Sequence, residues 1–125
     1  MKCDRVYISA PITGRDINER KLYFSIAAEQ LKKLGYTAVN PLAAATSLTL
    51  THEEYMRADI ALLLRCDGYI QAYDAIGSRG CELEEQVADG CGIRLVGVIT
   101  RLGEVKLLRS ELRKEQHVKT KEKTR

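Results

Sequence analysis

The sequence of 125 residues has little of several features, and each scarcity excludes a class of protein. Two prolines and nine glycines are too few for a collagen or a low-complexity chain. No apolar run reaches the roughly 18 residues that a membrane-spanning helix needs, so we expect no membrane association. The first residues include Arg5 and lack the layout of a secretory signal peptide, so we expect a cytoplasmic protein.

Metal-binding patterns are also missing. No two of the four cysteines form a Cys-x-x-Cys pair, and neither histidine lies at zinc-ligand spacing from a cysteine. We therefore expect thiols of a reducing compartment, with no metal site and no organic cofactor. The residues concerned are Cys3, Cys66, Cys81, Cys91, His52 and His117.

An excess of positive charge is missing outside the last segment of the chain. Residues 104–125 hold eight Lys or Arg and four Glu, which gives +4, whereas the preceding residues hold 12 basic and 13 acidic side chains, which gives −1. The formal net charge of +3 therefore comes from the tail. It does not indicate a basic face on the domain that would bind nucleic acid. We expect one domain over 1–103, a basic helical or disordered tail over 104–125, and no nucleic-acid partner.

Short runs rich in β-branched and aromatic residues alternate with segments of helical periodicity. Asp16 with Glu19, and Thr51 with Glu54, are predicted to cap the first two helices. We expect strands at 5–9, 36–39, 69–73 and 94–99, helices after Asp16, from Thr51 to Arg65 and from Gly80 to Asp89, and a loop over 42–50. Beyond Gly103 the spacing of Val105, Leu108 and Leu112 predicts a helix-compatible tail to about Glu115.

The alternation of strands and helices predicts the fold. It favours an α/β protein with a doubly wound parallel sheet of four to five strands and helices on both faces. Ligands of such sheets bind beyond the carboxyl ends of the strands. Here the loops at those ends cover residues 10–15, 40–50 and 74–80.

Two carboxylates are expected on apolar faces of helices. Asp59 follows Met56 by three residues and precedes Leu63 by four, which puts it at the edge of that stripe. Glu84 lies in the middle of the stripe that Val87 continues. An isolated charge in such a place is unfavourable unless it is paired or faces a cavity, and its pKa rises as in many catalytic sites.

Plainer alternatives exist for both carboxylates. Asp59 would be explained by an ion pair with Arg57 or Arg65, or by a hydrated position at the helix edge. Glu84 would be explained by a place in the first turn of its helix, where the helix dipole favours negative charge. Three further acidic residues of the helix that carries Glu84 are expected to face solvent: Glu82, Glu85 and Asp89.

The loop after the first strand enters a helix, so its backbone amides are candidates for holding an anion. It is neither a Walker loop nor a Gly-x-Gly-x-x-Gly fingerprint. Ser78 and Gly80 offer a hydroxyl and backbone donors at another helix start, and Tyr7, in an apolar strand, needs a partner for its phenol if buried.

Four segments carry a resemblance to a known family. They read Val-Tyr-Ile-Ser-Ala-Pro-Ile-Thr-Gly at 6–14, Tyr-Met-Arg-Ala-Asp-Ile at 55–60, Cys-Asp-Gly at 66–68 and Ser-x-Gly-x-x-x-Glu at 78–84. In this order and spacing they resemble the nucleoside 2-deoxyribosyltransferase superfamily, which includes 2′-deoxynucleoside 5′-monophosphate N-glycosidases. The likeness is greatest to its short bacterial and phage members and covers residues 4–99.

The resemblance implies a flavodoxin-like (Rossmann-like) sheet, no cofactor, a nucleoside or nucleotide as small-molecule partner, and a homo-oligomer. By motif position, Glu84 matches the nucleophile that forms a glycosyl ester. Asp59 matches the carboxylate that contacts the sugar or assists the leaving base, and Tyr7 matches the tyrosine that orients the nucleophile. The segments that match the wall around the sugar or its 5′-phosphate hold Ser9, Ala10, Pro11, Ile12, Thr13, Gly14, Ser78 and Gly80.

Two departures from the family pattern bear on the reaction. Transferases of the family carry an acidic residue six positions before the nucleophile, whereas Ser78 stands there and resembles the monophosphate N-glycosidases. The first loop has Ala10 and Pro11 where those glycosidases have a Gly-Ser-type loop, and Pro11 lacks an amide donor.

Three functions follow as expectations. The first is cleavage or transfer at the N-glycosidic bond of a (deoxy)nucleoside or its 5′-monophosphate through a covalent glycosyl-Glu84 intermediate. The alternative is a non-catalytic module on the same fold that binds or senses a nucleotide-like ligand. The third is a structural or interaction protein that uses the basic tail. Separately, the apolar stripe of the tail is a candidate for the contacts of the homo-oligomer that the resemblance implies.

Overall fold

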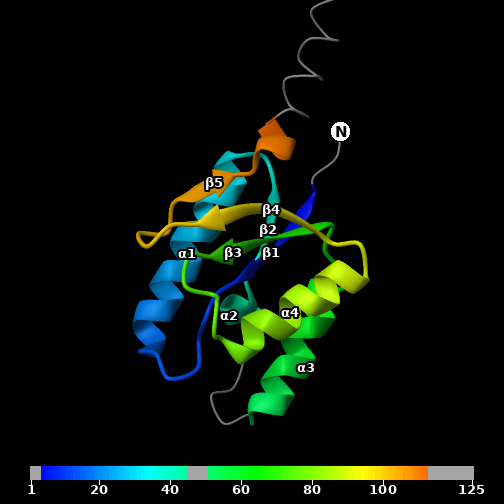
Figure 1. Ribbon diagram of the computed structural model, residues 1–125. Helices are drawn as coiled ribbons and strands as arrows, with labels where there is room; N and C mark the ends of the chain where they lie inside the picture. The colour runs from blue at the N-terminus through cyan, green and yellow to red at the C-terminus, as the bar shows by residue number, and fades with distance from the viewer. Residues whose placement is uncertain (1–3, 45–50, 113–125) are drawn as a thin grey trace, which may run out of the picture.

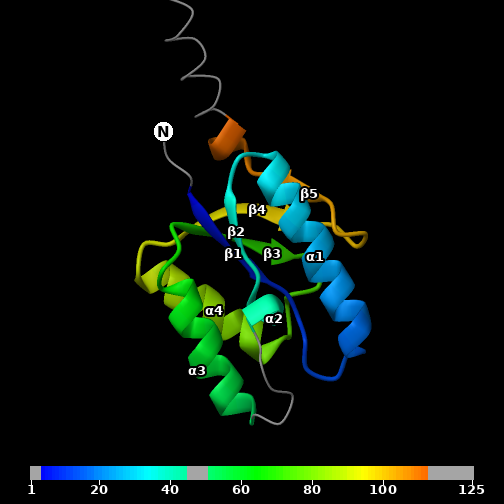
Figure 2. The ribbon, with the colours of Figure 1, turned by 180° about the vertical axis from the view of Figure 1, so that it is seen from behind.

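A computed structural model describes residues 4–44 and 51–112 of the chain. A five-stranded sheet stands at its centre, as the two opposite views of Figures 1 and 2 show. Helix α1 (Ile17–Lys33) packs against one face, and α3 (His52–Leu63) and α4 (Arg79–Gly90) pack against the other. The doubly wound α/β architecture predicted from the sequence is thereby confirmed.

The strand order of the sheet is β2-β1-β3-β4-β5. The strands are β1 (Arg5–Ser9), β2 (Thr37–Val39), β3 (Gly68–Ala72), β4 (Arg94–Ile99) and β5 (Val105–Leu107). The first four are parallel, and β5 is antiparallel to β4. Because the chain leaves β1 toward β2 and returns to its other side as β3, the strand order switches between the carboxyl ends of β1 and β3, where such sheets bind ligands.

Side chains alternate along β1, so this strand contributes to the apolar cluster on each face of the sheet. Val6 and Ile8 point toward α1 and pack there with Phe24. Tyr7 points the other way, into the cluster under α3 and α4 that includes Leu63. The phenol of Tyr7 therefore lies on the side of the sheet from which the two carboxylate-bearing helices approach.

Side-chain caps fix where two of the helices begin. The Asp16 carboxylate accepts hydrogen bonds from the N–H groups of Asn18 and Glu19 and caps α1. The Glu19 carboxylate does not complete a capping box, because it binds the Arg20 guanidinium. Thr51 caps α3 in a complete capping box with Glu54, as its spacing predicts.

The tail prediction is wrong for residues 105–107. These form β5, which pairs with the end of β4, and helix resumes only from Arg109 to Leu112. Pairing is possible because Gly97 lacks a side chain: a Cβ there would lie 2.5 Å from the carbonyl oxygen of Lys106. The sheet therefore continues past the predicted boundary at Gly103, and residues 113–125 lie outside the described part.

Two smaller features complete the fold. The predicted loop over 42–50 begins as a short helix, α2 (Pro41–Ala44), and residues 45–50 lie outside the described part. Within residues 4–44 and 51–112, no helix is long and apolar enough to cross a membrane.

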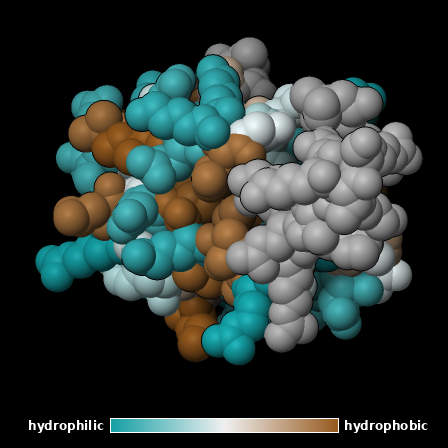
Figure 3. All heavy atoms as spheres, turned by 90° about the horizontal axis from the view of Figure 1, so that it is seen from above, coloured by the Kyte–Doolittle hydropathy of each residue, from teal (hydrophilic) through white to brown (hydrophobic). Residues whose placement is uncertain are grey.

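Apolar side chains interrupt the hydrophilic surface of the end seen in Figure 3. The predicted assembly of several copies stays a prediction.

Candidate active site

Glu84 is a buried carboxylate held by hydroxyl groups of β1. Its side chain, on the second turn of α4, belongs to a residue that is only 5% exposed. The Tyr7 hydroxyl donates to Oε2 at 2.5 Å, and the Ser9 hydroxyl donates to Oε1 at 2.7 Å. Because both oxygens are engaged from the sheet side, the carboxylate has a fixed orientation at the carboxyl end of β1.

Burial dominates the electrostatics of this carboxyl group. It raises the pKa of Glu84 to about 7, although the hydrogen bonds from Tyr7 and Ser9 act in the opposite direction and the charge of Asp59 adds to the rise. Burial and the Glu84 charge together raise the pKa of Tyr7 well above its ordinary value. The Tyr7 phenol therefore stays protonated and remains a hydrogen-bond donor at neutral pH.

Asp59 is the second carboxylate of the site. It projects from α3 into the cavity that Glu84 also lines, and burial raises its pKa to about 6. Neither Arg57 nor Arg65 forms an ion pair with it in the described residues, so of the two plainer alternatives the ion pair does not apply. The two carboxylates predicted on apolar helix faces thus meet at one cavity.

The cavity has a volume of about 330 Å³, which suits a nucleoside-sized ligand. Backbone and side chains from α2, α3, the start of α4 and the loop after β1 enclose it. Of the predicted site residues, those in its wall are Ala10, Ile12, Thr13, Asp59, Ser78, Gly80 and Glu84. Tyr7 and Ser9 lie behind Glu84, Pro11 lies in the wall of an adjoining cavity, and Gly14 is in neither wall.

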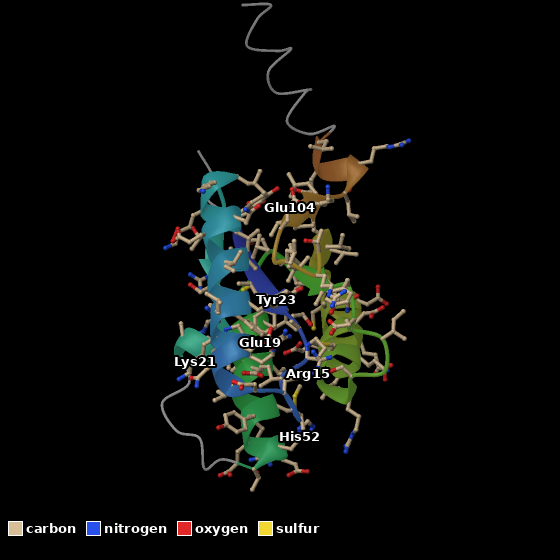
Figure 4. All side chains as sticks on the ribbon, turned by 90° about the vertical axis from the view of Figure 1, so that its left-hand side faces the viewer. Arg15, Glu19, Lys21, Tyr23, His52 and Glu104 are labelled. Carbon is tan, nitrogen blue, oxygen red and sulfur yellow. The ribbon has the colours of Figure 1, made fainter. Side chains whose placement is uncertain are left out.

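Several residues of the cavity wall were not predicted as site residues from the sequence. His52, Tyr55, Met56 and Leu42 line the cavity, as does the buried Cys81. Three of them carried a usable signal, because positions 52, 55, 56 and 59 recur at helical spacing and therefore share one face of α3 with Asp59. Figure 4 shows His52 at the same end of the molecule as Arg15, which comes from the loop before α1.

The loop after β1 is fastened by an arginine that the sequence analysis did not single out. The Arg20 guanidinium is buried, donates to the Pro11 carbonyl at 3.1 Å, and binds Glu19 through two nitrogens at 2.6 Å each. It also lies 4.5 Å from the ring centroid of Tyr23. These contacts fix the path of the loop, and with it the positions of Ala10 and Ile12 in the cavity wall.

Ligand sets for a metal are not present in the described residues. No group of three or more His, Cys, Asp or Glu side chains in 4–44 and 51–112 is arranged to hold an ion. The reactive groups at the centre of the site are the carboxyl groups of Glu84 and Asp59, with the hydroxyls of Tyr7 and Ser9 held against Glu84.

The fold and this pair of carboxylates define an α/β protein of the flavodoxin-like kind with a candidate site at the strand ends. The chain belongs to the family of domains of unknown function DUF4406, whose match covers residues 4–97. No curated protein matches the sequence significantly.

Solved structures share the fold at low identity. A 2-deoxyribosyltransferase from Bacillus psychrosaccharolyticus aligns with 82% of this chain and 76% of its own, at 18% identity and a TM-score of 0.60. The CMP N-glycosidase BcmB of Clostridium botulinum aligns with 77% of this chain and 66% of its own, at 16% identity and a TM-score of 0.48. The likeness to the first structure confirms, at the level of the fold, the resemblance noted from the sequence.

Proposed function

We propose that the protein cleaves or transfers at the N-glycosidic bond of a (deoxy)nucleoside or nucleoside 5′-monophosphate, with Glu84 as the nucleophile. The observation that carries this proposal is the Glu84 carboxylate, held by Tyr7 and Ser9 at the wall of a nucleoside-sized cavity that Asp59 shares. The shared fold with a 2-deoxyribosyltransferase agrees with it.

The reaction divides two roles between the carboxyl groups. An oxygen of Glu84 attacks the anomeric carbon C1′, the C1′–N bond breaks, and its electron pair goes to the base, which takes a proton from Asp59. Water or another base then attacks C1′ of the glycosyl ester, loses a proton to Asp59, and releases Glu84 as a carboxylate. Two displacements at C1′ retain its configuration.

The raised pKa values determine where the proton of the pair lies before the reaction. Burial raises the pKa of Asp59 to about 6 and that of Glu84 to about 7, so the pair titrates close to neutrality. Between these values the pair carries one proton, and the higher pKa places it on Glu84 in the empty site. The proposed roles therefore require this proton to be on Asp59 when Glu84 attacks. Tyr7 donates to Glu84 throughout, which favours the ionised form and orients it toward the cavity.

The proposal is tested by chromatographic detection of free base from a panel of nucleosides, deoxynucleosides and their 5′-monophosphates. We expect release by the wild type and a loss of at least about 10³-fold in kcat for Glu84→Gln, because the other carboxyl group of the wall, Asp59, serves as the acid. Asp89→Asn, which changes an exposed acid on the same helix, is the matched control and keeps the wild-type rate.

The covalent step has its own readout. A substrate whose ester turns over slowly, such as a 2′-fluoro arabinonucleoside, is expected to add the mass of its sugar to the wild type and not to Glu84→Gln. Absence of base release from every member of the panel would contradict the proposal. Saturable binding of the same ligands without release would then favour the sensor alternative.

A further inference from the structure

A second cavity adjoins the first at the start of α4. It has a volume of about 580 Å³, and Thr13, His52, Ser78 and Gly80 line both cavities. The first cavity offers apolar side chains such as Tyr55 and Met56, which suit the flat face of a base. Glu84 and Asp59 line the first cavity and not the second, so the second cavity offers space for a substituent of a sugar bound at Glu84.

Positive charge distinguishes the wall of the second cavity. Arg15 and Arg79 both line it, from the loop before α1 and from the first residue of α4. Arg15 binds the carboxylate of Asp74, which also faces this cavity, with 2.8 Å between Nη2 and Oδ2. Arg79 is exposed and forms no ion pair with any carboxylate in residues 4–44 and 51–112. Because Arg15 neutralises Asp74, Arg79 leaves the wall with a net positive charge.

The start of α4 adds backbone donors to this charge. The first N–H groups of a helix have no acceptor within it, and the helix dipole favours an anion beside them. The α4 helix has 12 residues, with Ser78 as its N-cap. Glu82, in the first turn, accepts a hydrogen bond from the Gly77 N–H at 3.1 Å, but its carboxylate is not part of the cavity wall.

We propose that the second cavity binds the 5′-diphosphate of a nucleotide, so that the substrate class is a nucleoside 5′-diphosphate or a longer 5′-phosphate ester. This inference rests on the proposed function, because it places the sugar at Glu84. A first phosphate on the 5′ oxygen meets the wall that both cavities share, at Thr13 and Ser78. The second phosphate then lies in the part of the wall that only the second cavity has, beside Arg79.

A matched series of substrates measures the effect of each phosphate. Base release is followed from one nucleoside and its 5′-mono-, di- and triphosphate, in buffer without divalent ions. We expect kcat/KM of the wild type to be at least about tenfold higher for the diphosphate than for the monophosphate, as for a well-placed charged hydrogen bond. A diphosphate that reacts no better than the monophosphate would overturn the inference.

Substitution at Arg79 assigns the preference to this wall. In Arg79→Ala the ratio of diphosphate to monophosphate kcat/KM falls toward one, while the value for the free nucleoside stays within about twofold of wild type, since Arg79 does not line the first cavity. Arg79→Lys recovers part of the ratio. Arg109→Ala, an exposed arginine far along the chain, is the control and changes none of these values. An equal loss for all substrates in Arg79→Ala would contradict the assignment.

Binding of inorganic diphosphate separates this inference from the proposed function. Calorimetry of the wild type is expected to show diphosphate binding at least about tenfold tighter than phosphate, with the difference lost in Arg79→Ala. If no nucleotide releases its base but this binding is found, the proposed function fails and the anion site stands. If base is released and inorganic diphosphate binds no better than phosphate, the function stands and the inference fails.

Discussion

Burial of Glu84 couples the site to the stability of the fold. An exposed glutamate has a pKa near 4.5, and in the folded protein burial raises it to about 7. Between these values the folded state binds a proton that the unfolded state has released. The contribution of this carboxyl to stability is therefore fully present below pH 4.5 and is lost as the pH rises through 7.

Glu84→Gln removes this loss, because the amide stays neutral at every pH. At pH 8 we expect the variant to be more stable than the wild type by up to about 3 kcal/mol, and at pH 4.5 the difference disappears. Urea unfolding of both proteins at the two pH values measures it, with Asp89→Asn as the exposed control. A difference in stability that is the same at both pH values would show that the gain does not come from the buried charge.

The elements bring the two carboxyl groups together through a close approach of α3 and α4. Gly80, in the first turn of α4, faces Met56 of α3, and a Cβ there would lie 3.3 Å from the Met56 sulfur. This contact is tight, but the methionine side chain is flexible and can move. Since Met56 lines the first cavity, its displacement narrows the space beside Asp59 and Glu84.

Gly80→Ala is therefore expected to impair base release without lowering the stability of the fold. Alanine favours the helix by up to about 1 kcal/mol over glycine, so the melting temperature stays or rises, while KM for base release increases severalfold. Adding Met56→Ala restores KM by reopening the cavity. Gly90→Ala, on the same helix with open space around it, leaves KM unchanged. An unchanged KM in Gly80→Ala would show that the methionine moves away from the cavity.

The elements also show what local sequence patterns reveal. The spacing of apolar residues predicted four strands and three long helices, because each pattern arises within its own segment. It failed at Val105, whose spacing with Leu108 and Leu112 suits a helix equally well, because pairing with β4 across Gly97 decides the structure there. A strand of three residues is too short to show a periodicity of its own, so its pairing with β4 could not be predicted from the sequence around it.

The candidate site also contains residues that the sequence predicts and contacts that only the structure reveals. Glu84 and Asp59 were visible because a charge within an apolar stripe needs an explanation, and the resemblance then supplied expected roles. The hydrogen bond from Arg20 to the Pro11 carbonyl and the ion pair of Arg15 with Asp74 depend on the path of two loops. No periodic pattern encodes those paths, so these contacts appear only in the structure.

At the scale of the whole molecule, a charge network fastens the end opposite the cavities. Arg94, the first residue of β4, binds Asp4 with 2.5 Å from Nη2 to Oδ2 and Glu111 with 2.8 Å from Nε to Oε2. The Tyr36 hydroxyl donates to the same Glu111 carboxylate at 3.0 Å, and Glu111 is only 4% exposed. The network thus joins the beginning of β1, the approach to β2 and the segment after β5.

Arg94→Met is expected to destabilise the protein by about 2 kcal/mol, because it leaves Glu111 buried without its guanidinium partner. Glu111→Gln has a smaller effect, since the amide oxygen still accepts from Tyr36 and Arg94. Urea unfolding measures both variants, and the rate of base release per folded molecule stays unchanged because the cavities lie at the other end. A reduced rate in Arg94→Met at full folding would contradict this separation of the two ends.

The buried carboxyl pair has a consequence for laboratory selection. A random library of this gene that is screened for heat resistance alone, near neutral pH, is expected to enrich replacements of Glu84 and Asp59 by neutral residues. Such a screen would yield robust proteins from which the proposed chemistry has been removed. Selection in this family therefore has to couple survival on heating to turnover in every round.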